Sequence, residues 1–462
     1  MNQEEPKELT LKDVEKAVSG TAAAFRCRTR LQPAGGEGDK VFPPTYAGAV
    51  YAVEQRRVKI ERADGSQGFE TVTCVLLDSV QSQANRMEEA LQDAIDAGRI
   101  KIPVIQVDFS SFYPGDEKPE KLRLIDPIGM VTSLQVPHRV ADAILRLSVV
   151  RNGDEFRKSE EGRLIDRARV SNATPLYKIC PTALIFGIWD STGPKGGLGS
   201  KFERAISSEV VGVGAVFGTR TQSRIDPVIA KNPELYQKAD SSWTVDPDDA
   251  EKDAEGKPKK FGKKLSEMNL GNVPPDYARY DAKAITNENR QTVDPMRSDG
   301  SPIQAGRVRP GGVTIDYAEQ TTVLSLAALR RLRFPEKDKS WEPGEQQRKR
   351  DSAARTVLAA LALCAAELAV EAGLYFRSRC LLWPDDARHW ELLEKPGQDA
   401  KPFKLDADSA ISLLQGALKS AREAGLEWES EPIPLTPSED LVKLVRQSQL
   451  AAAKGVEREE GA

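Results

Sequence analysis

The sequence of 462 residues predicts an α+β fold with a helical C-terminal region. Segments near its start alternate apolar and polar residues, which is the period of a β-strand with one buried face. Between and after them, apolar residues recur at three- and four-residue spacing, the period of an amphipathic helix. An Ala- and Leu-rich stretch at 346–373 predicts one long helix. These patterns divide the chain into an N-terminal helix or arm at 1–20, a mixed core at 21–345 and helices at 346–462.

The first strand is predicted at residues 24–31, where apolar or small side chains alternate with arginines. Because strand side chains alternate between faces, three arginines lie on one face: Arg26, Arg28 and Arg30. A solvated strand face usually mixes charges of both signs, so an unbroken arginine row favours phosphate contact.

A β-hairpin at 50–77 comes next, and it is followed by a helix closed by Gly98, a strand at 103–109 and a helix at 140–147. The first turns of the helix after the hairpin carry a polar cluster: Gln81, Asn85 and Arg86. This cluster could serve as a cap, a partner surface or a nucleotide contact, and the sequence does not rank these uses.

A glycine-rich loop with two lysines lies between Thr182 and Arg204. The apolar run at 183–188 predicts a buried strand before it, and a helix is predicted to start near Ser200 and to continue through Ile206. Glycines let backbone N–H groups approach a ligand, and a helix N-terminus attracts anions, so the loop predicts phosphate binding. A tight strand-to-helix turn with solvated lysines explains the loop equally well. The residues concerned are Lys195, Gly196, Gly197, Lys201 and Arg204.

Beyond the loop, residues 210–217 predict a strand, and the polar turn after it adds Arg220 and Arg224 as a second candidate for phosphate or sugar contact. An acidic block followed directly by a basic block marks an insertion at about 231–310. Because few apolar residues interrupt these blocks, we expect an exposed, partly mobile segment. The sequence after the insertion predicts a strand and a helix from Gly312, and then helices at 346–373, at 408–425 and from Thr436.

The composition excludes several classes of protein. A net charge of −4, from 66 basic and 70 acidic residues, counts against a simple coating protein for nucleic acid but allows a local basic groove. Five scattered cysteines and two histidines predict neither a disulfide framework nor a zinc site. The first residues lack the features of a signal peptide, and the most apolar helix is too short and Ala-rich to span a bilayer, so we expect a cytoplasmic protein.

An enzyme is a second possible function, although the common enzyme motifs are not found. The glycine-rich loop does not match G-x-x-x-x-G-K-[ST], and G-x-S-x-G and H-E-x-x-H are absent from the sequence. Aspartates at predicted strand ends or turns could hold Mg²⁺ together, although such residues most often cap turns: Asp78, Asp108, Asp190 and Asp226. A metal-dependent nuclease or nucleotide-hydrolysing enzyme that uses the loop is therefore the alternative function.

Several segments in order resemble one family: R-T-R-L-Q-P-A-G-G-E-G-D-K, L-L-D-S-V-Q-S-Q-A-N-R-M-E-E-A-L, P-H-R-V-A-D-A-I, W-D-S-T-G-P-K-G-G-L-G-S-K-F-E-R-A, T-Q-S-R-I-D-P and G-G-V-T-I-D-Y-A-E-Q-T-T-V-L-S-L. Over roughly residues 20–390 the chain resembles the RAMP-superfamily backbone subunit of type I CRISPR interference complexes, of the I-G (formerly I-U) subtype.

This resemblance implies an RRM-like (ferredoxin-like) core with large insertions, and a non-catalytic subunit without a cofactor or metal. It implies that the protein grips CRISPR guide RNA by phosphates and sugars and polymerises on it with further copies of itself. The target DNA strand and the other subunits of the complex are further implied partners, and a membrane is not. A scaffold that contacts only proteins is the third possibility. The expected guide contacts are Arg26, Arg28, Arg30, Gln81, Asn85, Arg86, Arg139, Lys195, Gly196, Gly197, Lys201, Arg204, Arg220 and Arg224.

Overall fold

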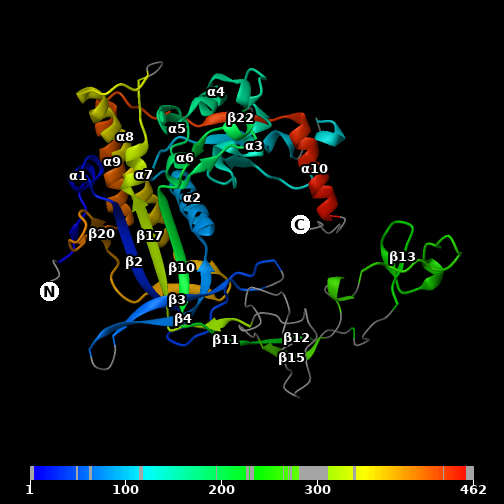
Figure 1. Ribbon diagram of the computed structural model, residues 1–462. Coiled ribbons are helices and arrows are strands. Elements are labelled where there is room, and N and C mark those ends of the chain that lie inside the picture. Colours follow the sequence, from blue (N-terminus) through cyan, green and yellow to red (C-terminus); the bar gives the residue numbers. More distant parts are fainter. Residues whose placement is uncertain are drawn as a thin grey trace.

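The computed structural model describes residues 5–453 except 48–49, 62–64, 114–117, 194, 225–227, 229–233, 264, 269, 271–272, 280–310, 337–339 and 430. Its centre is a large sheet in the order β1-β21-β20-β2-β17-β10-β4-β3, with β19 also paired to β2 and β18 to β19 (Figure 1). The strands of this sheet are β1 Lys7–Glu8, β2 Ala24–Pro33, β3 Val53–Glu61, β4 Gln67–Asp78, β10 Ile206–Val213, β17 Tyr317–Ser325, β18 Tyr375–Arg377, β19 Cys380–Pro384, β20 Trp390–Leu393 and β21 Lys401–Lys404.

The α+β class is confirmed, and the inner strands have the neighbours of a ferredoxin-like sheet. Along the chain, β2, helix α2 (Val80–Asp96), β10, β17, helix α8 (Glu345–Glu371) and β20 follow in the order βαββαβ. In the sheet, β17 lies between β2 and β10 and is antiparallel to both, and β20 is antiparallel to β2 on its other side. The β3–β4 hairpin extends this core beyond β10.

Helices cover one face of the sheet and leave the other face open. α8 packs against β17, α2, α1 (Leu11–Ser19) and α9 (Ala407–Glu423). By length and composition, α8 is the one helix in the described part of the chain that could cross a membrane, but 78% of its apolar window is buried inside the fold. An apolar helix buried on nearly all sides is the core helix of the molecule.

A second layer of elements lies beside the ends of the central strands (Figure 1). It contains a small sheet in the order β6-β5-β22-β7 and short helices around it. The bounds are β5 Ile105–Asp108, β6 Met130–Thr132, α3 Ala143–Arg146, β7 Ser148–Val149, α4 Glu160–Arg167, α5 Thr174–Ile179, α6 Thr182–Phe186, β8 Ile188–Trp189, β9 Lys201–Phe202, α7 Leu326–Arg331, β22 Ile433–Pro437 and α10 Glu439–Ala453. The 3₁₀ turns are Ser110–Phe112, Glu120–Leu122, Arg139–Ala141, Phe156–Lys158, Gly196–Leu198, Pro247–Asp249 and Leu265–Met268.

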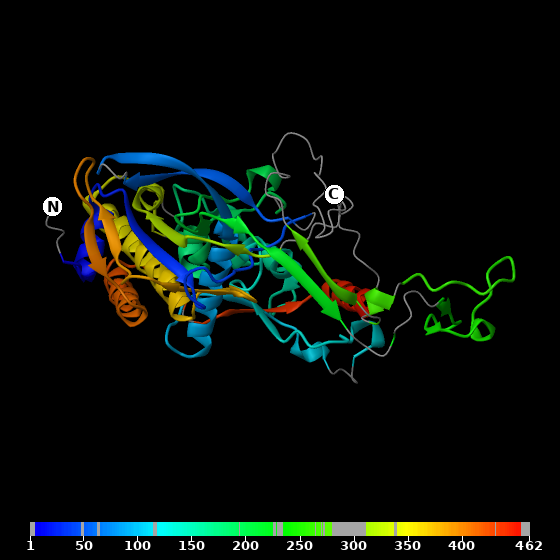
Figure 2. The ribbon, with the colours of Figure 1, turned by 90° about the horizontal axis from the view of Figure 1, so that it is seen from below.

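The insertion between β10 and β17 leaves the sheet as a ribbon (Figure 2). It pairs β11 (Val216–Phe217) with β16 (Val313–Thr314) and β12 (Thr219–Arg224) with β15 (Val273–Arg279). A small hairpin, β13 (Tyr236–Gln237) with β14 (Trp243–Thr244), lies beyond it. There the predicted acidic and basic blocks pair with each other, as in Lys259–Glu251 at 3.0 Å and Lys257–Glu255 at 2.9 Å. The expected exposure is confirmed for most described residues of 234–268, whereas residues 280–310 lie outside the described residues.

Most predicted elements are confirmed, with different ends. The N-terminal helix, the strand β2, the hairpin β3–β4, the helix α2 closed by Gly98, the strands β5 and β17 and the helices α7 to α10 all form. The helix predicted at 140–147 is shorter, because it is a 3₁₀ turn followed by α3, whose N-terminus is capped by Asp142. The strand predicted at 210–217 is interrupted at Gly214, where φ is +69° and the chain passes into the ribbon.

The prediction around the glycine-rich loop is wrong on both sides. Residues 182–186 form helix α6 and not a strand, because the apolar run is buried on every side and its periodicity does not separate the two structures. Gly187, with φ of +82°, ends α6. After the loop the chain forms strand β9 and enters β10 at Ile206, so no helix starts near Ser200.

The C-terminal region is more than a set of helices. Its strands β19 and β20 pair with β2, β21 pairs with β1, and β22 runs parallel to β5. Buried Glu367 of α8 accepts hydrogen bonds from Arg388 and from the Trp390 indole, at 2.8 Å each, and so fixes β20 on the core helix. The predicted boundary at residue 345 therefore does not separate two structural units. All five cysteines are buried and free, as the scattered spacing predicts.

Candidate nucleic-acid interface

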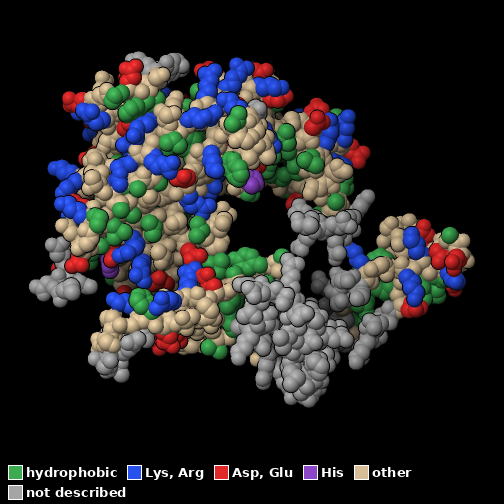
Figure 3. All heavy atoms as spheres, in the orientation of Figure 1, with side chains coloured by type: hydrophobic (Ala, Val, Ile, Leu, Met, Phe, Trp, Pro, Cys, Tyr) green, Lys and Arg blue, Asp and Glu red, His purple; other side chains and the backbone are tan. Residues whose placement is uncertain are grey.

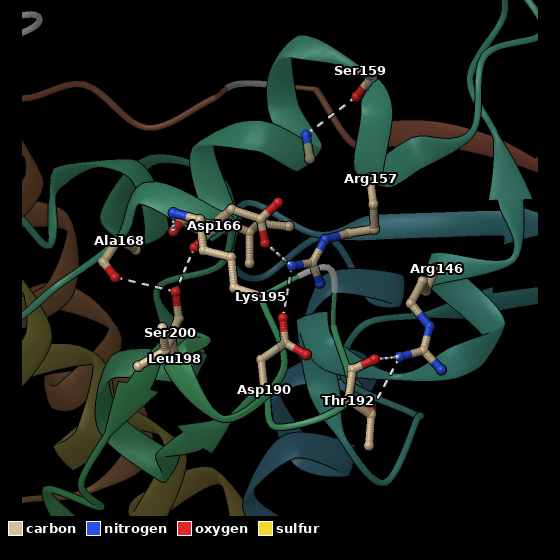
Figure 4. A network of polar contacts seen from close by, with 12 residues as sticks. Arg146, Arg157, Ser159, Asp166, Ala168, Asp190, Thr192, Lys195, Leu198 and Ser200 are labelled. Carbon is tan, nitrogen blue, oxygen red and sulfur yellow. Dashed lines mark hydrogen bonds and ion pairs between the residues drawn. The ribbon is translucent and has the colours of Figure 1, made fainter.

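The glycine-rich loop is the tip of a small antiparallel hairpin formed by β8 and β9. Buried Arg157 anchors it, with one Nη atom donating to Asp190 at 2.6 Å and also to Asp166 of α4 (Figure 4). Buried Ser200 donates its hydroxyl to carbonyl oxygens at the end of α4. The loop is therefore held in place by the side chains of Arg157 and Ser200. The helix N-terminus that was predicted to favour phosphate binding does not form.

The predicted loop residues differ in their surroundings. Lys195 is exposed and donates to the carbonyl oxygen of Asp166 at 3.0 Å. A Cβ at Gly196 or Gly197 would meet no atom within 4 Å, so the outer side of the loop is open to a ligand. At Gly199 a Cβ would lie 1.8 Å from the carbonyl oxygen of Asp190, so only glycine fits there.

We expect Gly199→Ala to lower the free energy of unfolding by about 3 kcal/mol, because the new Cβ overlaps backbone that buried Asp190 holds in place. Gly197→Ala is the matched control, since its Cβ enters open space. Urea unfolding of both variants measures the difference. Equal stability of the two variants would show that the backbone next to Gly199 shifts to make room for the new Cβ, and so is not held in place by Asp190.

The predicted arginine row on β2 exists, but it is charge-paired. Arg26 binds Glu391 of β20 at 2.7 Å, and Arg28 binds Glu319 of β17 at 2.6 Å. Arg30 lies 3.7 Å from Asp385 and stacks on the ring of Tyr317. These carboxylates come from strands or loops next to β2 in space, so the open sheet face carries both signs and attracts phosphate less than an unpaired row would.

Two other predicted contacts hold the fold together. Arg139 is buried, has φ of +51° and donates to both oxygens of Glu88 at 2.6 and 2.7 Å. Burial raises the pKa of the Glu88 carboxyl to about 7, against the opposing effect of the Arg139 charge. Arg86 binds buried Asp78 at 3.1 Å and the carbonyl oxygen of Phe376 at 2.7 Å. Arg86 and Arg139 therefore have partners within the fold, and their contact with the guide stays a prediction.

The remaining predicted residues are spread over three places. Gln81 and Asn85 are exposed on the first turns of α2. Arg220 lies on β12 and is half-buried. Burial raises the pKa of the nearby Tyr51 hydroxyl, and the charge of Arg220 lowers that pKa by a smaller amount. The backbone of Arg224 also lies on β12, and its side chain is outside the described residues.

Basic side chains gather around β9, which the structure brings next to α3 and α7. Two hollows, of about 590 and 330 Å³, share Lys201, Phe202 and Glu203. The larger hollow also contains Arg204, and the smaller one Arg331. We call this region the β9 surface and define it by Arg146, Trp189, Lys201, Arg204 and Arg331. Figure 3 shows Lys and Arg side chains gathered on this side of the molecule, over α4, α7 and the nearby strand ends.

The β9 surface combines cations with an exposed aromatic ring. Trp189 is 64% exposed, and the ammonium group of Lys201 lies 4.9 Å from its ring centroid. Arg204 donates to the carbonyl oxygen of Val80 at 2.9 Å, and burial lowers its pKa, with the Arg139 charge adding to this effect. Arg331 binds Glu203 at 2.6 Å, and both side chains are exposed. A basic surface beside an exposed aromatic ring is suited to a single-stranded nucleic acid.

Sequence reasoning found Lys201 and Arg204 but missed Arg146 and Arg331. In the sequence, Arg331 is one of three arginines near the C-terminus of the helix predicted after Gly312, where cations suit the helix dipole. Nothing local links it to Lys201, which is 130 residues earlier in the numbering. Only the pairing of β10 with β17 brings the ends of β9 and α7 together.

The aspartates considered for Mg²⁺ have separate surroundings. Asp78 accepts from Arg86, Arg377 and Gln83, whereas Asp190 is bound by Arg157. Asp108 accepts a hydrogen bond from the backbone of Ser110, and Asp226 lies outside the described residues. In the part of the chain that the structure describes, no three His, Cys, Asp or Glu residues gather in a group that could hold a metal ion.

Comparison with known proteins agrees with the resemblance seen in the sequence. None of the curated proteins matches the chain. Residues 25–216 match the family model described as CRISPR-associated protein GSU0053, a stretch that begins in β2 and contains α2, the β8–β9 hairpin and β10. The match covers less than half of the chain, and over that stretch the protein is similar to a CRISPR-associated protein family.

Proposed function

We propose that the protein is a non-catalytic backbone subunit of a CRISPR interference complex, which holds the guide RNA by its phosphates and sugars. The family match supports a role in CRISPR defence together with other subunits. The type I-G resemblance of the sequence supports the backbone role, and cytoplasmic action on a target DNA strand paired to the guide is part of the same proposal.

The observation that carries the proposal is the β9 surface. Its cations come from α3, from β9 and the residue Arg204 after it, and from α7, three segments that are distant in sequence. Of the described residues that line its two hollows, Glu203 is the one carboxylate. A cluster of cations on a folded scaffold binds the repeating phosphates of a strand whatever its base sequence, which is what a guide-holding subunit requires.

The ribbon formed by β12 and β15 supports assembly into a polymer. It leaves the sheet between β10 and β17 and extends beyond the body of the protein (Figure 2). We propose that this extension contacts the next copy along the guide. Copies related by translation along one strand make heterologous, head-to-tail contacts, which need a projecting part of this kind.

The test is co-expression of the full chain with a CRISPR array, followed by purification and light scattering. We expect bound RNA of guide length, a particle mass of several protein copies and release of RNA as salt concentration rises. A monomer free of RNA after co-expression would contradict the proposal. Cleavage of RNA or hydrolysis of ATP that depends on Mg²⁺ would instead support the enzyme alternative.

A further inference from the structure

A third hollow, of about 620 Å³, opens beside the β9 surface at the ends of α4 and α7. Arg169, Lys201, Arg331 and Arg333 line it, together with Trp341. We call it the Arg333 hollow. No carboxylate is present among the described residues that line it. Arg331 is paired with Glu203, which does not line the hollow, and the other three cations give the hollow a positive potential.

Two of these cations are held in place by groups that do not neutralise them. Arg169 donates to the carbonyl oxygens of Asp166 and Ala168, at 3.0 and 2.6 Å. Arg333 donates to the carbonyl oxygens of Arg330 and Leu332, at 2.6 and 3.1 Å. Carbonyl oxygens fix the position of a guanidinium but leave its full charge, so both charges are preorganised for an anion.

The carboxylate closest to Arg333 is already shared by other donors. Asp351 lies 3.9 Å from Arg333 Nε, and it accepts from the Trp341 indole at 2.9 Å and from the backbone N–H of Phe334 at 2.8 Å. It also lies 3.3 Å from Arg355. Asp351 therefore orients Trp341, on whose ring Arg333 stacks at 5.0 Å, more than it neutralises Arg333.

The walls of the hollow are joined by backbone. The N–H of Arg333 donates to the carbonyl oxygen of Val170 at 2.9 Å, and the N–H of Ala173 donates to the carbonyl oxygen of Arg333 at 2.8 Å. Two backbone hydrogen bonds thus hold the segments that carry Arg169 and Arg333 side by side. The hollow is open to solvent, and its volume of about 620 Å³ exceeds what one inorganic ion needs.

We propose that the Arg333 hollow binds the phosphate group of a nucleotide, with room for the attached nucleoside. The charge of the walls selects the phosphate, and Trp341 supplies an aromatic wall. A free nucleotide and a nucleotide of a bound strand offer the same chemistry, so the experiment separates these two sources. The inference goes beyond the proposed function, because the hollow adds Arg169, Arg333 and Trp341 to the Lys201 and Arg331 that it shares with the β9 surface.

The test is calorimetric titration of the full chain with pyrophosphate and with AMP. We expect saturable binding of both, weakened about tenfold or more by Arg333→Gln and by Lys201→Gln, because each change removes a charge-assisted contact. Lys201 is exposed, so its variant keeps the test valid if Arg333→Gln does not fold. Lys158→Gln is the control, since it removes an exposed lysine paired with Glu155 and should leave affinity unchanged.

Competition with single-stranded RNA then identifies the source of the phosphate. Displacement of RNA by pyrophosphate would place the hollow on the path of the strand, and binding of both together would make it a site for a free nucleotide. Both results support the site. Absence of pyrophosphate binding, or binding that neither variant weakens, overturns it. RNA binding without pyrophosphate binding overturns this inference and leaves the proposed function standing.

Discussion

Lys201→Glu combined with Arg331→Glu is expected to weaken binding of single-stranded RNA about a hundredfold at moderate salt. Each change removes a charge-assisted phosphate contact, worth about tenfold in affinity, at an exposed position where folding is spared. The slope of log affinity against log salt should become shallower by about 1.4, because two phosphate contacts are lost on a single strand. Fluorescence anisotropy with a labelled RNA at several salt concentrations measures both quantities.

Two control variants make this result specific to the β9 surface. Lys257→Glu with Lys259→Glu makes the same charge change on the exposed insertion and should weaken binding only slightly. Arg28→Glu with Arg30→Glu tests the β2 row, where the effect should be smaller because a carboxylate, Glu319 or Asp385, faces each arginine. In the β9 pair Glu203 faces Arg331, whereas Lys201 lies over the Trp189 ring. An equal loss for all three pairs would mean that total charge, and not the β9 surface, controls RNA binding.

Arg157→Met is expected to lower the free energy of unfolding by about 3 to 5 kcal/mol, the cost of breaking a buried ion pair on one side. Arg157 is 5% exposed, and its loss leaves buried Asp190 and partly buried Asp166 without their shared cation. Thermal or urea unfolding measures the change. Because the Arg157–Asp190 ion pair also anchors the glycine-rich loop, the Arg157→Met variant should bind RNA more weakly at temperatures where it is still folded.

A matched change at the next residue separates this effect from general loss of charge. Lys158→Met removes an exposed lysine whose ion pair with Glu155 is worth little, so stability should change by less than about 0.5 kcal/mol. Adding Asp190→Asn to Arg157→Met should recover part of the lost stability, since it removes one unpaired charge. No recovery would indicate that Arg157 acts through packing and not through its ion pairs.

The sequence predicts local structure well wherever one face of a strand or helix is buried and the other is exposed to solvent. The strand β2, the hairpin β3–β4 and helix α2 follow this pattern and form as expected. The stretch around α6 is buried on all sides, so its residues carry no period, and helix and strand cannot be told apart from it. The intrinsic helix and strand propensities of these residues then do not give the correct assignment.

Charges are harder to interpret from sequence than apolar patterns. The arginines of β2 form an unbroken row along the chain, yet their partners Glu319 and Glu391 lie on neighbouring strands about 290 and 365 residues away. Sequence separation also hides the β9 surface and the Arg333 hollow. Their cations are brought together by the pairing of β10 with β17 and by backbone hydrogen bonds of Arg333 with Val170 and Ala173. Net local charge is a property of the folded surface, and the order of residues does not give it.

The pairing of the last strands with the first has a consequence for synthesis in the cell. β2 remains an open edge until β19 and β20 have been made, and β5 stays unpaired on the side away from β6 until β22 has been made. Contacts of such sequence separation close late and fold slowly. The small sheet therefore stays incomplete until residues 433–437 have been synthesised, after every strand of the central sheet.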